Sequence, residues 1–565
     1  MNILGINAVY HESSAALLVD GKIVAACEEE RFNRIKHAKE ARIDNPHEPP
    51  EQSIRFCLDA AGLQASQIDR VAYSFDPRIR RAEFHADWWP NPQMEPEFLR
   101  CLGAVDDATD AILGRKRGRA VKFVSHHLAH AASAYYPSGF DPAAILVIDG
   151  IGEAACSTLA RGEGPRIEII ETFSYPHSLG FVWEQASAYL GFSTYDAAKV
   201  MGLAAYGDPE VYRQQLASVI RVSEDSYEVD LAALGFFPTF HSGFEALLGP
   251  SRKEDEEILP RHMDFAATLQ MVTDAAVVAL LRRLERSVKA DRLCVAGGVA
   301  LNCVTNELIR KASSYAEIFI PSAPHDAGTA VGAALAVYCA ERRTKPAPSG
   351  ATPYLGPQFD EGNVLAAVKQ AGLTARRSKD AAREAADMIA DGNIVGWFQG
   401  RMEFGPRALG NRSLLADPRH PDTRPSTGKT FGRSHPASLP NAPANGSTSG
   451  RIGQPRIHAV CLSDESRASR THSGRASSRR NGTSTTRAAR GQSALPRVDF
   501  TLLRSNRRAA RSQHLAQRQR ADRLHACPRD RHVLQGWHRR AVYGRHLPYV
   551  ADLSQASTIP PAGGA

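Results

Sequence analysis

The chain has 565 residues, room for about three to four domains, and a formal net charge of +8. No apolar stretch approaches the roughly eighteen residues of a membrane span. The N-terminal "MNILGINAVYHES" lacks the basic and apolar regions of a secretory signal, and the nine cysteines are scattered without a CxxC pair. We therefore expect a cytoplasmic protein with free thiols and no membrane span.

The charge is divided unevenly along the chain. Residues 424–565 hold 25 Lys and Arg against 6 Asp and Glu, a net charge of +19, whereas residues 1–423 hold 44 against 55, a net charge of −11. A basic protein ordinarily suggests a nucleic-acid partner. Because the basic charge belongs to the tail, we expect no nucleic-acid partner for the acidic body.

The first sixty residues predict a small sheet followed by a helix. A hairpin turn is expected at Asp20-Gly21, and a helical spacing of apolar residues begins at residue 51 and stops at Gly62. The expected strands are residues 2–7, 14–20 and 22–30.

The same alternation of strands and helices recurs further along the chain. We expect a strand that turns at Asp149-Gly150, a hairpin at 156–173, a helix at 264–288, a strand that ends in Gly297-Gly298, a strand, loop and helix at 316–338, and a helix at 381–390 followed by a short strand. Alternating strands and helices predict α/β layers. The Asp-Gly and Gly-Gly turns suit a nucleotide cleft, where backbone N–H groups approach phosphates. An ordinary tight turn is the alternative for each of them alone.

Two histidines and two aspartates are candidate metal ligands. His126 and His130 in "SHHLAHAASAYY" lie four residues apart on a predicted helix, which points both imidazoles the same way. An ordinary pair of surface or core histidines is the alternative. Asp149 ends an apolar strand and Asp326 stands just before a helix, where turn formation is the competing explanation. Together the four would form a mixed nitrogen and oxygen site suited to Fe(II), Mn or Zn.

Four cationic side chains are candidate anion-binding groups. Lys199 lies among small residues in "YDAAKVMGLAAYGDP", where it could meet a phosphate or could be a solvated helix residue. Arg401, Arg407 and Arg412 lie in the glycine-rich "GWFQGRMEFGPRALGNRS" (396–413). Arginine offers forked donors for phosphate or carboxylate. An ordinary surface loop is the alternative.

Taken together, these motifs resemble one family, the ATP-dependent carbamoyltransferases that include the nodulation protein U group and antibiotic O-carbamoyltransferases. They run in the family's order from residue 1 to about residue 419. The matching stretches are "NAVYHESSAALLVDGKIVAACEEERFNRIKHA", "SHHLAHAASAYY", "LVIDGIGE", "DAAKVMGLAAYGDP", "GGVALN", "HDAGTAVGAAL" and "GPRALGNRSLLADPR".

The resemblance implies an α/β fold with two domains. Residues 1–350 would form a large domain of the actin and sugar-kinase type, similar to the universal tRNA-modification protein Kae. Residues 351–423 would begin a smaller α+β domain that resembles the YrdC fold and is truncated here.

The resemblance also implies a reaction. Carbamoyl phosphate would be cleaved in the small domain and the carbamate joined to ATP, and the resulting carbamoyl-adenylate would donate its carbamoyl group to a hydroxyl at a metal-bearing site in the large domain. The cofactors would be ATP and a divalent metal, Fe(II) first, with Mg²⁺ as an option for ATP. The acceptor would be a lipo-chitooligosaccharide nodulation factor, or else an antibiotic or another small hydroxyl compound.

The resemblance assigns roles to residues of this chain. The metal ligands would be His126, His130, Asp149 and Asp326, and His11 would be the catalytic residue facing the adenylate and the acceptor. Lys199, Gly297, Gly298 and Asn302 would belong to the nucleotide site, and Arg407 would bind carbamoyl phosphate.

The tail, residues 424–565, departs from the family. Patterns such as "KxRExFRPFAP" and "LNTSxNxxGEPI" are missing, but codons exist for residues 426–448 that spell an "FRPFAPSVL" segment in a shifted frame. In the other shifted frame, residues 511–521 can hide "VLNTSLNVSG" and residues 537–548 can hide "GIDALYMGDIY". We infer a frameshifted, disordered tail and a chain that is inactive in the full reaction. The alternative is a natural basic tail that makes this a nucleic-acid-binding protein.

Overall fold

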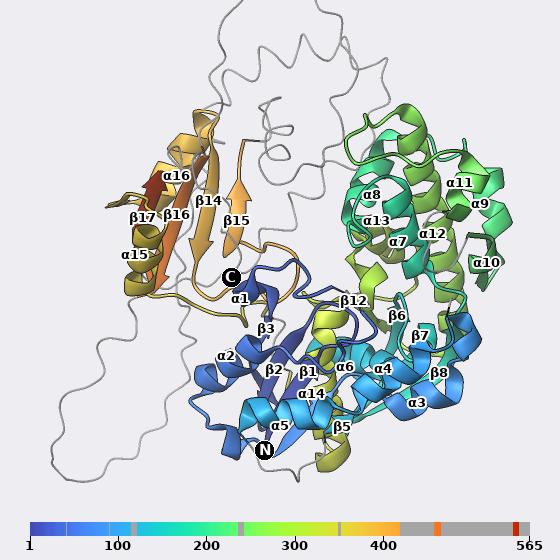
Figure 1. The fold of residues 1–565 in the computed structure, drawn as a ribbon, viewed down its shortest axis with the longest axis horizontal. Coiled ribbons are helices and arrows are strands. Elements are labelled where there is room, and N and C mark those ends of the chain that lie inside the picture. Colours follow the sequence, from blue (N-terminus) through green and yellow to red (C-terminus); the bar gives the residue numbers. More distant parts are fainter. Residues whose placement is uncertain are drawn as a thin grey trace, which may run out of the picture. The chain divides into compact units, whose positions relative to one another are not determined.

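The computed structural model describes residues 1–40, 42–89, 91–114, 121–234, 242–348, 352–417, 457–464 and 546–552. These residues form two compact units (Figure 1). The first unit contains residues 1–357 and 401–409. The second contains residues 358–400 and 410–417 together with the two later segments.

The first unit contains two five-stranded sheets with the same topology. Their strand orders are β3-β2-β1-β4-β5 and β8-β7-β6-β11-β12. In each sheet the first three strands run antiparallel to their neighbours, and the last two continue parallel to the central strand. A repeated unit of this kind is the topology of actin-like and sugar-kinase-like domains, so the predicted fold class of this part is confirmed.

The strands of the first sheet are β1 (Asn2–Asn7), β2 (Ser14–Val19), β3 (Lys22–Glu28), β4 (Arg70–Tyr73) and β5 (Lys122–Phe123). Those of the second are β6 (Ala143–Ile148), β7 (Ala155–Glu163), β8 (Arg166–Ser174), β11 (Arg292–Ala296) and β12 (Glu317–Phe319). A small hairpin contains β9 (Ile220–Val222) and β10 (Tyr227–Val229).

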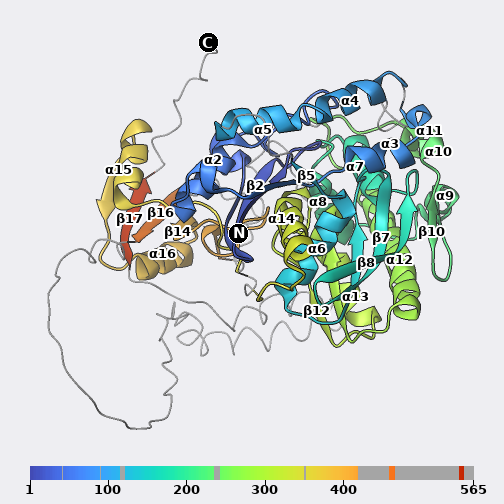
Figure 2. The same ribbon diagram turned by 90° about the horizontal axis from the view of Figure 1, so that it is seen from below.

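Two helices lie between the sheets, α6 (His126–Ser138) and α14 (Asp326–Arg342) (Figure 2). Helix α14 packs on β1 and β2, α6 packs on β6 and β11, and the two helices pack against each other. Glycine allows this close approach, since a Cβ at Gly332 of α14 would lie 1.7 Å from the carbonyl oxygen of Ala129 in α6. A helix surrounded by protein on all sides is apolar all round, which explains the Ala-rich, Gly-rich sequence of α14.

The remaining helices of the first unit are α1 (Glu30–Asn33), α2 (Glu51–Ala61), α3 (Pro77–Glu83), α4 (Met94–Leu102), α5 (Val105–Leu113), α7 (Leu179–Tyr189), α8 (Ala197–Leu203), α9 (Arg213–Val219), α10 (Leu231–Leu234), α11 (Ser242–Leu248), α12 (Pro260–Ser287) and α13 (Cys303–Ala312). The expected hairpin at Asp20-Gly21 is confirmed, with both residues in the left-handed region, and so is the end of α2 at Gly62.

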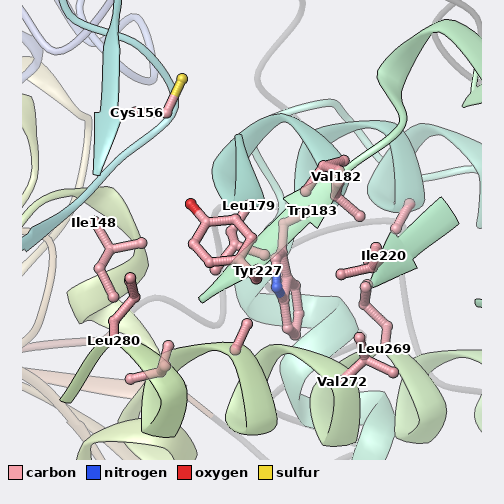
Figure 3. Packing of buried hydrophobic residues seen from close by; sticks show 14 of the residues in the cluster. Ile148, Cys156, Leu179, Val182, Trp183, Ile220, Tyr227, Leu269, Val272 and Leu280 are labelled. Carbon is pink, nitrogen blue, oxygen red and sulfur yellow. The ribbon is translucent and has the colours of Figure 1, made fainter. Parts of the chain in front are cut away.

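Helix α12 supports the core beneath the second sheet. In Figure 3 its residues Leu269 and Val272 lie on the side of Trp183 of α7 and Ile220 of β9, and Leu280 lies beside Ile148 of β6. Among the described residues, α12 is the helix long and apolar enough to cross a membrane, and 67% of its most apolar stretch is buried inside the protein. That burial is typical of a core helix.

The second unit contains a mixed sheet of order β13-β17-β16-β14-β15. Helix α16 packs on β14, with Ala381 and Ala385 buried against Val395. The elements are α15 (Glu361–Gln370), α16 (Ala381–Ala390), β13 (Ala375–Arg377), β14 (Ile394–Gln399), β15 (Arg412–Leu415), β16 (Ile457–Asp464) and β17 (His546–Asp552). Strands β16 and β17 fall within the tail for which disorder was expected, and the rest of the tail lies outside the described residues.

Candidate metal centre and active site

Four buried side chains converge at the end of helix α6. One donor atom from each of His126, His130, Asp149 and Asp326 lies within 4.8 Å of the others. The two histidine Nε2 atoms are 3.1 Å apart. Each lies 3.4–3.5 Å from Asp149 Oδ2 and 3.5 Å from Asp326 Oδ1. The sequence prediction that these four residues come together therefore agrees with the geometry.

The outer hydrogen bonds of the two imidazoles direct their lone pairs inward. His126 Nδ1 lies 3.0 Å from the carbonyl oxygen of Ser74, and His130 Nδ1 lies 3.1 Å from that of Pro324. A carbonyl oxygen can only accept a hydrogen bond, so both Nδ1 atoms carry hydrogen. In a neutral ring Nε2 then carries a lone pair, which points into the cluster. Two lone pairs and two carboxylate oxygens facing one another require a positive charge between them.

The residues fit a divalent metal ion. The separations of 3.1–3.5 Å between Nε2 and carboxylate oxygens match ligands placed about 2.0–2.2 Å from a common centre. Two nitrogens with two carboxylate oxygens suit Fe(II), Mn or Zn. Burial opposes the charged forms of these groups, but mutual attraction outweighs it. The pKa of His126 and of His130 is raised, and the pKa of Asp149 and of Asp326 is lowered.

His11 stands beside this cluster. Its Nδ1 lies 3.4 Å from Asp326 Oδ2, while Oδ1 of the same carboxylate faces the two ligand histidines. Burial lowers the pKa of His11, but Asp326 more than compensates and raises it to about 9. The ring of Tyr195 covers His11 at a centroid distance of 4.5 Å. Asp326 thus joins the predicted catalytic residue to the predicted metal site.

The predicted nucleotide residues are divided between two places. Gly297 has φ +95°, and a Cβ there would lie 2.1 Å from the carbonyl oxygen of Ile148. The N–H of Gly298 donates to Asp149 Oδ1 at 2.7 Å. Asn302 caps helix α13, accepting from the N–H groups of Val304 and Thr305. This loop therefore lies directly against the metal cluster.

Lys199 lies at the start of helix α8. Its Nζ is 2.6 Å from Asp196 Oδ2, and Lys36 binds the other oxygen of the same carboxylate at 2.5 Å. Lys36 and Lys199 therefore share the carboxylate of Asp196. The two ammonium groups and the one carboxylate together carry a net charge of +1.

The three arginines of the glycine-rich loop have different places. Arg407 is exposed in the first unit and donates to the carbonyl oxygen of Leu301 at 3.3 Å. Arg401 donates to the carbonyl oxygens of Val24 and Gly356, a structural role. Arg412 lies in β15 of the second unit.

Several site residues were not predicted from the sequence. Glu12 and His37 form a second histidine–carboxylate pair through Oε1 and Nδ1, with the His37 ring 5.9 Å from that of His11. Glu184 lies beside Gly150, and burial raises the pKa of its carboxyl to about 8. A glutamate inside the apolar "LGFVWEQASAY" of α7 was the available signal. Glu12 offered only its place next to His11 in the sequence, and His37 offered no signal of its own.

A cavity of about 650 Å³ lies elsewhere, lined by Asp141, Asp291, Arg292, Tyr315 and Glu317. These residues stand at the beginnings of β6, β11 and β12, whereas Asp149 and Gly297 follow the ends of β6 and β11. Ligands of α/β folds bind outside the carboxyl ends of the strands. The metal cluster, not this cavity, is therefore the candidate active site.

The repeated α/β unit and the buried two-histidine, two-aspartate cluster define a protein of the actin and sugar-kinase fold class with a candidate metal centre. Comparison with known proteins gives the family. The carbamoyltransferase N-terminus model matches residues 2–335, and the carbamoyltransferase C-terminus model matches residues 386–433. The chain belongs to the carbamoyltransferase family and is a transferase.

Three relatives illustrate the similarity. The chain is 36% identical over 450 residues to the uncharacterized protein sll1178 of Synechocystis, covering 74% of this chain and 71% of that protein. It is 37% identical over 432 residues to nodulation protein NolNO of Sinorhizobium fredii, covering 75% of this chain but only 60% of that protein. It is 27% identical over 473 residues to nodulation protein U of the same species, covering 77% and 78%. Among solved structures, HypF of T. kodakarensis matches at 14% identity with a TM-score of 0.32, covering 61% of this chain and 48% of that one.

Proposed function

We propose that this protein, with the reading frame of its tail restored, is an O-carbamoyltransferase that uses carbamoyl phosphate and ATP, through a carbamoyl-adenylate, to carbamoylate a hydroxyl group. The observation that carries the proposal is the position of Asp326. One of its oxygens faces the two ligand histidines and the other faces His11, in a chain that belongs to the carbamoyltransferase family. A group that takes up a proton therefore stands next to a site that fits a metal ion.

The residues around the cluster divide the chemistry between them. His126, His130, Asp149 and Asp326 would hold a divalent cation, which would supply positive charge to polarise the carbamoyl oxygen and offset the charge of the departing phosphate. His11 is oriented through Nδ1 by Asp326. Because its pKa is raised to about 9, the neutral ring whose Nε2 would accept from the acceptor hydroxyl forms at alkaline pH. As the acceptor oxygen bonds to the carbamoyl carbon, its proton passes to an imidazole and the bond to the adenylate phosphate oxygen breaks, releasing AMP.

His37 supplies a second imidazole at the same place. Glu12 orients its Nδ1. Burial raises the pKa of the Glu12 carboxyl, but the attraction of His325 and His37 outweighs burial and holds that pKa well below its usual range. An ionised Glu12 keeps the hydrogen of His37 on Nδ1 and leaves Nε2 as an acceptor. The rings of His11, His37 and Tyr195 would form the surface that receives the acceptor.

The remaining predicted residues take the nucleotide and the carbamoyl donor. The loop of Gly297 and Gly298 lies next to Asp149, to which the N–H of Gly298 donates, and would receive the adenylate phosphate. Lys199 would add positive charge on the nucleotide side. Arg407 would bind carbamoyl phosphate.

The acceptor we propose is a lipo-chitooligosaccharide nodulation factor, because relatives of this chain carry the names of nodulation proteins. An antibiotic or another small hydroxyl compound is the second candidate. Both carry a hydroxyl group that could receive the carbamoyl group, and an assay distinguishes them.

The test uses the printed chain and the chain encoded by a frame-restored gene, each supplied with labelled carbamoyl phosphate, ATP, a divalent metal and a panel of acceptors. We expect the frame-restored chain to form AMP and a labelled acceptor, and the printed chain to form neither. His11→Asn should reduce transfer about 10²–10⁴-fold, the usual contribution of a general base. Absence of AMP and labelled product from the frame-restored chain with every acceptor would contradict the proposal.

A further inference from the structure

Three chain segments meet at the N-terminus of helix α6, behind the ligand His126. They are the end of strand β4, the loop after β6, and the helix itself. The buried carboxylate of Glu153, 3% exposed, connects them. Its Oε1 accepts from the N–H of Asp76 at 2.7 Å and from the N–H of His126 at 2.9 Å, and Oε2 lies 3.2 Å from the same N–H of His126.

The backbone groups that Glu153 binds have no acceptor within their own helices. His126 is the first residue of α6, and the first four N–H groups of a helix lack internal partners. The side chain of Ser125 takes the N–H of Leu128, which leaves the N–H of His126 to Glu153. A carboxylate at this end also interacts favourably with the helix dipole.

The same carboxylate also holds the segment that carries the outer hydrogen-bond partner of the His126 ring. Nδ1 of His126 donates to the carbonyl oxygen of Ser74, two residues before the Asp76 whose N–H is held by Glu153. Both the backbone of His126 and the carbonyl that orients its imidazole are therefore tied to one side chain. His130 uses a separate carbonyl, that of Pro324.

The network extends further into buried polar side chains. The hydroxyl of Ser74 donates to Asn7 Oδ1 at 2.9 Å and accepts from Thr329 Oγ1 at 2.9 Å. Thr329 lies one turn after the ligand Asp326 in α14, and the Asn7 amide donates to the carbonyl oxygen of Glu12. A shift of the Ser74–Asp76 segment would therefore be transmitted to the ligand His126, to the start of α14 and to Glu12.

We propose that Glu153 is a positioning residue of the metal centre, which places Nε2 of His126 by holding both its backbone and the segment that orients its ring. The inference rests on the metal centre of the proposed function. It means that Glu153, which is not a ligand, contributes to the affinity of the site for the metal. Loss of an outer hydrogen-bond partner of a metal ligand typically lowers metal affinity about 10–100-fold.

The experiment titrates the full chain with Co²⁺ alone and follows the visible d–d absorption, with the melting temperature measured in parallel. We expect Glu153→Ala to bind Co²⁺ about 10–100-fold more weakly than the unmodified chain. Glu153→Gln keeps one acceptor oxygen and should recover part of that loss. The expected absorption spectrum of both variants differs from that of the unmodified chain, because the position of one ligand has changed.

The matched control is Glu29→Ala. Glu29 is also a buried carboxylate at a helix N-terminus, accepting from the N–H groups of Gln52 and Ser53 at the start of α2. We expect this variant to lower the melting temperature without changing Co²⁺ affinity. Glu153 variants that bind Co²⁺ as tightly as the unmodified chain, or a Glu29 variant that weakens binding equally, would overturn the inference. If the unmodified chain itself binds no Co²⁺, the metal centre of the proposed function is contradicted. That outcome is distinct from the two results that would overturn the role of Glu153.

Discussion

Asp326 illustrates how one residue gives the site its order. Its two oxygens face different partners, the ligand histidines on one side and His11 on the other. His127, the neighbour of His126 on the same helix, has no such role. Its Nδ1 lies 2.7 Å from the hydroxyl of Thr158, and burial lowers the pKa of its imidazole to about 3, so the ring stays neutral.

This contrast gives a residue-scale prediction. His130→Ala removes one of the four converging ligands and should reduce Co²⁺ affinity at least about 100-fold, more than loss of an outer partner. His127→Gln, on the same helix, should leave the affinity within about threefold, since His127 lies outside the cluster. Equilibrium dialysis of both variants measures the difference. Equal loss in the two would mean that helix α6 as a whole, rather than the four ligands, determines binding.

The ligands could be predicted from the sequence because their spacing is local. His126 and His130 are four residues apart on one helix, and Asp149 directly follows a buried strand. Glu153 and the Glu12–His37 pair could not, because their partners are set by tertiary contacts. The Glu153 carboxylate binds a backbone N–H 77 residues earlier in the chain, and no periodicity marks such a contact.

At the scale of elements, the site depends on how closely α6 and α14 pack. Helix α6 carries both histidines and α14 begins with Asp326, so the distance between these helices sets the distance between the ligands. Glycine at position 332 permits the contact, because a Cβ there would overlap the backbone oxygen of Ala129. The sequence pattern predicted both helices but not their contact with each other. Small residues show that a helix can be approached closely, but they do not show which helix approaches it.

Gly332→Ala should therefore separate the two helices. We expect a loss of about 2–3 kcal/mol in the free energy of unfolding, the usual cost of overpacking, together with weaker Co²⁺ binding. Gly202→Ala is the control, because a Cβ at this helical glycine of α8 meets nothing within 4 Å. That change should be neutral or stabilising by up to about 1 kcal/mol. Urea unfolding and Co²⁺ titration of both variants test the prediction, and normal Co²⁺ affinity in Gly332→Ala would contradict it.

At the scale of the molecule, predictability follows the charge boundary. Up to residue 417 the expected strands and helices are found, and the repeated sheet topology agrees with the family resemblance. Beyond it, strands β16 and β17 are described, and the remaining tail lies outside the described residues. The body carries a net charge of −11 and the tail +19, a change in composition that helix and strand periodicity does not explain.

The frameshift hypothesis accounts for this boundary and is tested first by resequencing the DNA for residues 415–565. We expect small insertions or deletions that restore "FRPFAPSVL", "LNTSLN" and "GIDALYMGD" in one open frame, and a restored protein that is less basic after residue 424. The restored cations would then complete the pocket for carbamoyl phosphate. If the frame stands as printed, the tail is a natural product of the gene. In that case its positive charge should retain the chain on nucleic acid in a salt-dependent way, and cutting at residue 424 should abolish that retention without affecting Co²⁺ binding by the body.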